Sequence, residues 1–119
     1  MNNLEETKLR LREFCKAREW DQFHSPKNLA MALSVETAEL LEHFQWLTEA
    51  QSAALPADKL AAVAQEIADV QIFLVRLADR LDVDIEAAVA AKLVLNEQKY
   101  PVDKARGNAL KYTEFDDGE

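Results

Sequence analysis

The sequence predicts an all-α protein, specifically a four-helix bundle with a short helical turn between its second and third main helices. Three observations support this fold class. The 119 residues include only 2 Gly and 3 Pro, the residues least compatible with helix interiors. Apolar side chains recur at helical spacing along most of the chain. Residues that start or stop helices stand between these apolar stretches.

The first two helices follow from apolar spacing and from one strong start signal. The first is predicted over residues 3–18, where four side chains repeat at helical spacing: Leu4, Leu11, Phe14 and Cys15. A loop over residues 19–24 follows it. Ser25 is a favourable N-cap, and Pro26 suits the first helical position, where its missing N–H costs nothing. The second helix is therefore predicted over residues 26–44.

The remaining helices are delimited by capping residues and prolines. Thr48 and Gln51 fit a capping box, so a single helical turn is expected there before Pro56 interrupts it. The third main helix is predicted over residues 58–81. Asp84 then caps a fourth helix, which Pro101 terminates because proline disfavours helical geometry in the residue before it. Beyond that point no period is visible.

Length and charge narrow the class of protein. The chain is short enough to form one domain over residues 1–119, with residues 113–119 expected to be a mobile tail. The excess of 22 Asp+Glu over 14 Lys+Arg argues against nucleic acid as a partner. The lone Cys15 cannot form an internal disulfide, and no apolar run reaches the roughly 18 residues of a membrane helix. A cytoplasmic protein with no membrane partner is expected.

Acidic residues interrupt the apolar faces of two predicted helices. Glu36 lies on the stripe of the second helix, with Glu39 at its edge; the stripe comprises Leu29, Ala32, Leu33, Glu36, Leu40 and His43. Glu66 lies on the stripe of the third helix, with Asp69 beside it; that stripe comprises Val63, Glu66, Ile67, Val70, Leu74 and Leu77. Four facing carboxylates would repel one another unless cations neutralise them. The alternative is that these acids form solvated helix faces, as paired acids usually do.

The chemistry of these acids favours one kind of metal. Ligands that offer only oxygen select hard cations, so Mg²⁺ is expected, with Mn²⁺ as a possible substitute. A di-iron bundle would need Glu-x-x-His on two helices. Neither His24 nor His43 has a glutamate three positions earlier, which disfavours iron.

Four segments resemble one known family. They are WDQFHSPKNL at residues 20–29, ETAEL at 36–40 with FQW at 44–46, EIADV at 66–70, and KLVLNEQKYPV at 92–102. Together they are similar to the MazG-type all-α nucleoside triphosphate pyrophosphohydrolases, and to the short dCTP pyrophosphatases among them. The two acidic motifs alone are weakly specific. Joined to the Trp-containing loop and the Tyr-Pro-Val segment, they are strongly so.

The resemblance implies a reaction and a set of catalytic residues. Similar proteins hydrolyse a nucleoside triphosphate to the monophosphate and pyrophosphate with Mg²⁺. The metal ligands and catalytic residues implied here are Glu36, Glu39, Glu66 and Asp69. One of these carboxylates, with Glu36 or Glu39 as the first choice, would orient or deprotonate the attacking water.

The resemblance also implies substrate-binding residues, namely Trp20, Phe23, His24, Trp46, Phe73, Lys92, Asn96 and Tyr100. Without it, the two tryptophans and Phe73 would be read as core residues, and His24 as a local hydrogen-bonding group. The three residues on the fourth helix would be a solvated polar stripe. Leu11 departs from the family, because related mammalian-type enzymes place a histidine nine positions before the loop tryptophan. Selectivity for cytosine therefore stays open.

The sequence thus leads to a favoured function and two alternatives. The favoured function is Mg²⁺-dependent hydrolysis of dCTP and modified dCTP for cleaning the nucleotide pool. The alternatives are a broad-specificity (d)NTP pyrophosphohydrolase and a non-catalytic helical interaction or scaffold domain. A homotetramer, with a dimer as the minimum, is expected because Ile72 and Val75 beside Leu74 suggest an exposed apolar face.

Overall fold

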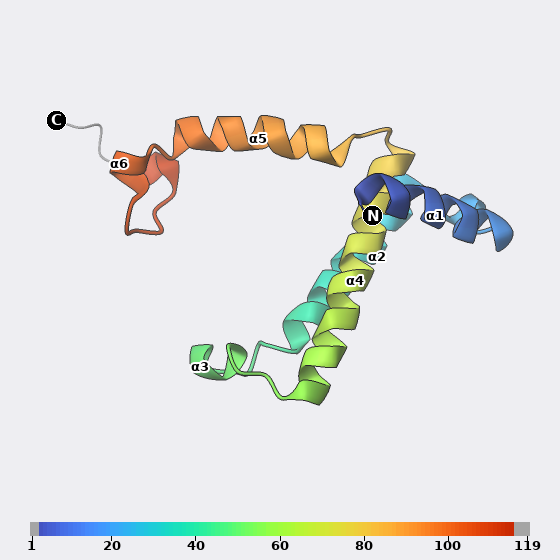
Figure 1. The fold of residues 1–119 in the computed structure, drawn as a ribbon, viewed down its shortest axis with the longest axis horizontal. Coiled ribbons are helices and arrows are strands. Elements are labelled where there is room, and N and C mark those ends of the chain that lie inside the picture. The colour runs from blue at the N-terminus through green and yellow to red at the C-terminus, as the bar shows by residue number, and fades with distance from the viewer. Residues whose placement is uncertain (1–2, 116–119) are drawn as a thin grey trace. The chain divides into compact units, whose positions relative to one another are not determined.

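The computed structural model describes residues 3–115, and all regular secondary structure there is helical (Figure 1). The predicted all-α class is confirmed. The elements are α1 (Leu4–Ala17), η1 (Asp21–Phe23), α2 (Pro26–Glu42), α3 (Glu49–Ser52), α4 (Ala57–Arg80), α5 (Ile85–Lys99), α6 (Val102–Ala105) and η2 (Tyr112–Glu114). The four main helices begin and end close to their predicted limits.

Side-chain caps explain why these helices begin where they do. Ser25 Oγ accepts a hydrogen bond from the Asn28 N–H at 3.1 Å, and Asp84 caps α5 in the same way. At α3, Thr48 Oγ1 accepts from the Gln51 N–H, and Gln51 Oε1 accepts from the Thr48 N–H at 2.9 Å. The predicted capping box is therefore confirmed. Each cap satisfies an N–H that has no partner within its own helix.

The segment after Pro101 contains more structure than the sequence pattern indicates. Pro101 is the N-cap of α6, and η2 follows further along the chain. Helices of four and three residues are too short to produce a visible apolar period, which is why the pattern missed them. Part of the predicted mobile tail, residues 116–119, lies outside the described residues, so its mobility stays a prediction.

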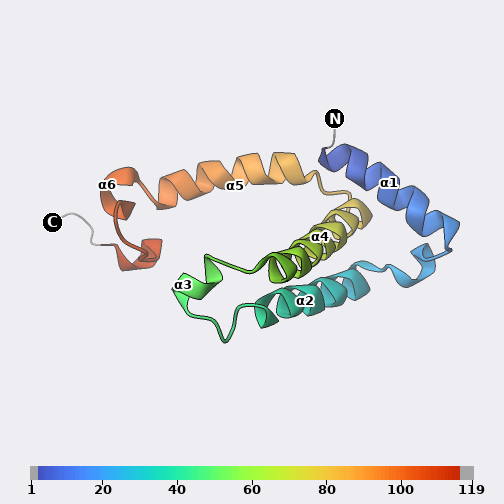
Figure 2. The same ribbon diagram turned by 60° about the horizontal axis from the view of Figure 1, so that its bottom comes forward.

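Contacts divide the chain into two units, one ending at Val83 and the other beginning at Asp84. In the first unit, α2 and α4 lie side by side as an antiparallel pair, and α1 also contacts α4 (Figure 2). The second unit contains α5, α6 and η2. The single domain and the place of α5 in a four-helix bundle stay predictions.

The core of the first unit lies between α1, α2 and α4. Its buried apolar side chains are Cys15, Leu29, Val63, Val75 and Ala78. Every member of the predicted stripe on α2 is buried or half-buried, as expected.

The predicted stripe on α4 is only partly right. Ile67 and Leu74 are 54% and 38% exposed, whereas Val75 is 2% exposed. The prediction that Val75 lies on an exposed face was wrong; Ile72, at 38%, is exposed as expected. The reason is that α4 contacts α1 as well as α2, so a second face becomes covered near its C-terminal end.

Candidate active site

The antiparallel pair of α2 and α4 brings three of the four predicted acidic ligands together. Glu36 and Glu39 lie one turn apart on α2, and Glu66 faces them from α4. One carboxylate oxygen from each lies within 4.8 Å of the others, and all three side chains are half-buried. We call these three residues the acidic cluster. Asp69 is half-buried one turn beyond Glu66 but is not part of this group.

The acidic cluster lacks internal compensation. The Oε2 atoms of Glu36 and Glu66 are buried and have no hydrogen-bond partner. The proximity of Glu66, then partial burial and the negative charge of Glu39, raise the pKa of Glu36 to about 7. Buried polar atoms normally find partners, and an unpaired one costs free energy. Oxygen ligands with unsatisfied lone pairs fit a hard divalent cation.

A cavity of about 420 Å³ lies between α1, the η1 segment and α4. Three of the predicted substrate-binding residues line it together: Trp20, His24 and Phe73. Leu11, the residue that departs from the related family, also lines it. The other lining residues are Thr7, Arg10, Phe14, Cys15, Ile72 and Arg76. We call this the aromatic cavity.

The end of α1 places Trp20 in the cavity wall. Glu19 adopts the left-handed conformation at φ 56°, and the Trp20 N–H donates to the Cys15 carbonyl at 2.9 Å. This is a Schellman motif, which reverses the chain after a helix. The Trp20 ring then contacts Phe14 edge to face, with ring centroids 5.6 Å apart.

Two other predicted aromatic contacts lie outside the aromatic cavity. Phe23, in η1, is 60% exposed, and Trp46, just past α2, is 86% exposed. Trp46 therefore does not pack into the core of its own unit, which was the alternative interpretation of this residue. Contacts of Phe23 and Trp46 with a nucleotide stay predictions.

The remaining predicted substrate-binding residues belong to the second unit. Lys92 is exposed and Asn96 is half-buried on α5. Tyr100 is the C-cap residue of α5, and its non-helical backbone takes it out of the helical repeat. Its ring lies against Tyr112 and Phe115, at centroid distances of 6.1 and 5.6 Å. A role for these three residues in binding substrate stays a prediction.

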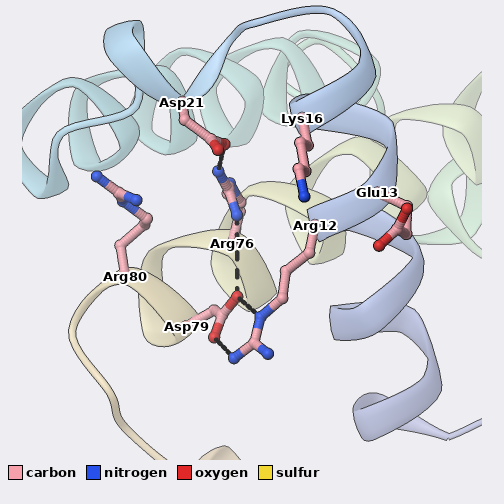
Figure 3. A pocket seen from close by; sticks show the side chains of 7 residues that line it. All are labelled: Arg12, Glu13, Lys16, Asp21, Arg76, Asp79 and Arg80. Carbon is pink, nitrogen blue, oxygen red and sulfur yellow. Dashed lines mark hydrogen bonds and ion pairs between the residues drawn. The ribbon is translucent and has the colours of Figure 1, made fainter.

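Figure 3 shows a network of arginines and aspartates that the sequence analysis missed. Its Arg76 also lines the aromatic cavity. Arg76 is 4% exposed and donates to Asp21 through Nη2 and to His24 Nδ1 through Nε. Its Nη1 lies 3.8 Å from Asp79, which accepts two hydrogen bonds from Arg12 at 2.8 and 2.6 Å. These residues form the arginine network. The available signal was an arginine within the apolar run of the third predicted helix.

Comparisons with known proteins identify the family. The MazG-like family matches residues 31–115, and the chain belongs to this family. The mouse protein dCTP pyrophosphatase 1 is 47% identical over 108 residues, which cover 89% of this chain and 64% of the relative. Human dCTP pyrophosphatase 1 is 43% identical over 109 residues, with the same coverage. The chain thus spans 64% of the length of these curated relatives.

A solved structure supports the same fold. A pyrophosphatase from Archaeoglobus fulgidus aligns with a TM-score of 0.79 and 41% identity. The alignment covers 85% of this chain and 94% of the archaeal one. Among the described residues, none of the helices has the length and apolar character needed to cross a membrane.

Proposed function

We propose that this chain is a Mg²⁺-dependent nucleoside triphosphate pyrophosphohydrolase that converts dCTP and modified dCTP to the monophosphate and pyrophosphate. The acidic cluster, with two buried and unpaired carboxylate oxygens, is the observation that carries the proposal. The names of the mouse and human relatives support the choice of dCTP. The expected role is cleaning of the nucleotide pool in the cytoplasm.

The metal ligands proposed are Glu36, Glu39 and Glu66, with Asp69 as the fourth. Mg²⁺ suits a site built from carboxylates alone, and Mn²⁺ is a plausible substitute. When bound, the ion supplies positive charge that offsets the negative charge of the triphosphate. The carboxylates would hold the ion, and Glu36 or Glu39 would accept the proton of the attacking water.

The aromatic cavity is the proposed base pocket. Phe73 lies seven residues after Glu66, on the same face of α4 and about 10 Å further along the helix. The triphosphate and the base can therefore engage the acidic cluster and the aromatic cavity together. Trp20 offers an aromatic surface on which a base can stack.

A broad-specificity (d)NTP pyrophosphohydrolase is the second candidate, and Leu11 favours it. The Leu11 side chain gives the cavity wall an apolar surface, which cannot read the hydrogen-bonding edge of a base. Under this alternative, dCTP would have no advantage over the other deoxynucleotides.

The proposed assembly is a homotetramer, with a dimer as the minimum. Several large apolar side chains of the first unit are more than half exposed, namely Met31, Val35, Leu41, Trp46, Leu60 and Ile67. Exposed apolar surface on this scale is typical of association between subunits. A monomer at micromolar concentration by light scattering would contradict this proposal.

Pyrophosphate release across a nucleotide panel tests the function. We expect pyrophosphate release from dCTP with Mg²⁺, release at a lower or different rate with Mn²⁺, and no release with EDTA. Product analysis should show dCMP and pyrophosphate. Equal rates for all nucleotides would favour the broad-specificity enzyme. Absence of release from every nucleotide, in a folded protein that binds Mg²⁺, would favour the non-catalytic scaffold.

A pair of tryptophan variants tests the base pocket. Trp20→Ala should weaken binding of every dNTP by about 5- to 150-fold, because stacking is worth roughly 1 to 3 kcal/mol and tolerates any base. Binding of inorganic triphosphate should be unchanged. Trp46→Ala tests the second predicted tryptophan separately, and a similar loss there would extend the base contacts beyond the aromatic cavity. Unchanged nucleotide binding in folded Trp20→Ala would remove the cavity from the proposal.

A further inference from the structure

The loop of residues 20–24 forms one wall of the aromatic cavity but buries little of its own surface. Trp20 and His24 line the cavity from this loop, which we call the cavity loop. Residues 20–23 are exposed, and the side chain of Asp21 is 51% exposed. Segments with few buried contacts open locally at a low cost in free energy. The position of this wall therefore depends on its polar contacts.

Two arginines of α4 supply the contacts that hold the cavity loop. Arg76 donates to Asp21 through Nη2 and to His24 Nδ1 through Nε. Arg80 Nε donates to the His24 backbone oxygen at 3.1 Å. In the described part of the chain, the other hydrogen bonds of the loop join it to itself or to residues that flank it in the sequence. Arg76 and Arg80 thus fasten the loop to a helix that is distant in sequence.

Arg76 is the better fixed of the two arginines. Its side chain is 5% exposed and lies between Asp21 and Asp79 (Figure 3). Asp79 is itself held by two hydrogen bonds from Arg12 of α1. A buried guanidinium needs charged partners, and Asp21 is the partner that the cavity loop contributes.

The helix that holds the cavity loop also carries part of the acidic cluster. Arg76 follows Glu66 by ten residues, which corresponds to about 15 Å along α4. A loop fastened to α4 at Arg76 is therefore kept at a fixed distance from the acidic cluster. A nucleotide that engages the acidic cluster and the aromatic cavity together requires this distance to be kept.

We propose that Asp21 and Arg76 are positioning residues for nucleotide binding, because their ion pair fastens the cavity loop to α4 and so holds the base pocket at the correct distance from the acidic cluster. Asp21 is not among the residues that line the aromatic cavity, so it acts through the position of the loop. The inference rests on the proposed function, because it takes the cavity as the base pocket. Without the ion pair, only the fraction of molecules with the loop in place binds the whole nucleotide well.

The position of the cavity loop is tested on the free protein, without any nucleotide. Trp46→Phe leaves Trp20 as the sole tryptophan, and quenching of its fluorescence by acrylamide reports how accessible the ring is. Trp20 is 42% exposed, so Asp21→Ala in this background should increase the quenching constant by up to about 2-fold. An unchanged quenching constant would overturn the proposal.

Glu13→Ala is the matched control for this measurement. Glu13 lines the same charged pocket as Asp21, but its carboxylate forms no ion pair with any of the described residues. The substitution removes the same negative charge and should leave the quenching of Trp20 unchanged. An equal increase for Glu13→Ala would mean that the lost charge alone, and not the ion pair with Arg76, changes the loop.

The role in nucleotide binding is tested by steady-state kinetics with dCTP. Asp21→Ala should raise KM by about 3- to 10-fold, the value of one hydrogen bond, and leave kcat within about 2-fold. Inhibition by inorganic triphosphate should be unchanged, because that ligand does not reach the cavity. Asp21→Asn keeps an oxygen acceptor for Arg76 and should recover part of the loss. A wild-type KM in Asp21→Ala, with its fold confirmed by circular dichroism, would overturn the proposal.

A double-mutant cycle tests whether Asp21 acts through Arg76. Arg76→Met replaces the buried guanidinium with an apolar side chain, a change that buried ion pairs often tolerate. Asp21→Ala should have no further effect on KM in the Arg76→Met background, because its partner is absent. The same increase in both backgrounds would overturn the pairing. The half-exposed Asp21 decides the proposal alone if Arg76→Met does not fold.

Binding of dCMP separates this inference from the function on which it rests. A wild type that releases no pyrophosphate from any nucleotide, but binds dCMP more tightly than Asp21→Ala does, would contradict the enzyme and support the positioning role. A wild type that hydrolyses dCTP, with the same KM and the same dCMP affinity as Asp21→Ala, would support the enzyme and overturn this inference.

Discussion

The acidic cluster and the arginine network are two charged groups that each include residues of α4, and they differ in how their partly buried charges are compensated. Glu36, Glu39 and Glu66 gather like charges, and two of their oxygens are buried without a partner. In the arginine network, Arg76 contacts two aspartates and a histidine, and Asp79 is also paired with Arg12. Roughly 15 Å of α4 separates Glu66 from Arg76.

The difference shows which partly buried charges are compensated within the fold and which are not. A network whose charges compensate one another contributes to holding α1, the η1 segment and α4 together. A cluster of unpaired carboxylates costs stability unless a cation neutralises it. Substitutions in the two groups should therefore have different effects. In the acidic cluster they should lower activity and leave the fold intact, whereas in the arginine network they should destabilise the fold.

The largest effect is expected on turnover from removing one acidic ligand. Glu39→Gln should lower Mg²⁺-dependent pyrophosphate release by at least about 100-fold, because even residues that only support metal ligands contribute 10- to 100-fold. Circular dichroism should show an unchanged helical fold. Glu42→Gln, an exposed position on α2, is the matched control and should retain activity.

Asp69→Asn extends this test to the residue that lies outside the three-carboxylate group. We expect the same loss of activity if Asp69 is the fourth ligand. Near-wild-type turnover of either variant at saturating Mg²⁺ would exclude that residue as a ligand. Unfolding of either variant would mean that the acids are structural.

The second prediction concerns stability and the arginine network. Asp79→Asn leaves the buried Arg76 and the Arg12 guanidinium without their shared carboxylate, so the free energy of unfolding should fall by about 3 kcal/mol. Urea denaturation measures the change. Asp82→Asn is the control, because Asp82 is exposed and asparagine tolerates its left-handed backbone. Equal stabilities for the two variants would show that the network contributes little.

The arginine network also makes the stability of the fold depend on pH in the acidic range. The hydrogen bond and charge of Arg12 lower the pKa of Asp79 below its ordinary value of 3.8. The stabilisation from Asp79 is thus present above that pH and is lost as pH falls through the lower pKa of the folded chain. The difference in stability between the wild type and Asp79→Asn should shrink accordingly.

The third prediction concerns the pH dependence of stability at the acidic cluster, which has the opposite sign. In the absence of metal, folding raises the pKa of Glu36 from 4.5 to about 7, so the folded chain holds a proton that the unfolded chain has released. Its contribution to stability should therefore decrease as pH rises through this range. Melting temperatures in EDTA should show this decrease, and Glu36→Gln should reduce it. Saturating Mg²⁺ should stabilise the wild type at pH 7.5; an identical pH profile for Glu36→Gln would contradict the prediction.

The smallest effect is expected at the turn that leads into the arginine network. Glu19 adopts φ 56°, a conformation that costs a non-glycine residue free energy. Glu19→Gly should stabilise the fold by about 0.5 to 1 kcal/mol, measured by thermal melting. Glu13→Gly, within α1, should destabilise it instead. A destabilised Glu19→Gly would show that the glutamate side chain contributes more than the backbone strain costs.

The sequence by itself determined the helices and the two helix faces on which the acidic residues of the candidate site lie. Caps such as Ser25 and Asp84 act on N–H groups three residues away, so local sequence is enough to find them. The apolar stripe on α2 was predicted correctly because one partner, α4, covers it. The acids were found for the same reason, since Glu36 and Glu66 interrupt stripes that face one another.

Only the tertiary structure decided what surrounds His24 and which face of α4 is buried. Arg76 meets His24 across 52 positions of sequence, and Arg12 meets Asp79 across 67. Helical spacing says which residues share a face but not which second helix covers that face. Because α1 packs on the C-terminal end of α4, Val75 and Arg76 become buried together. As a result, Arg76, an arginine within an apolar run, is buried and donates a hydrogen bond to His24.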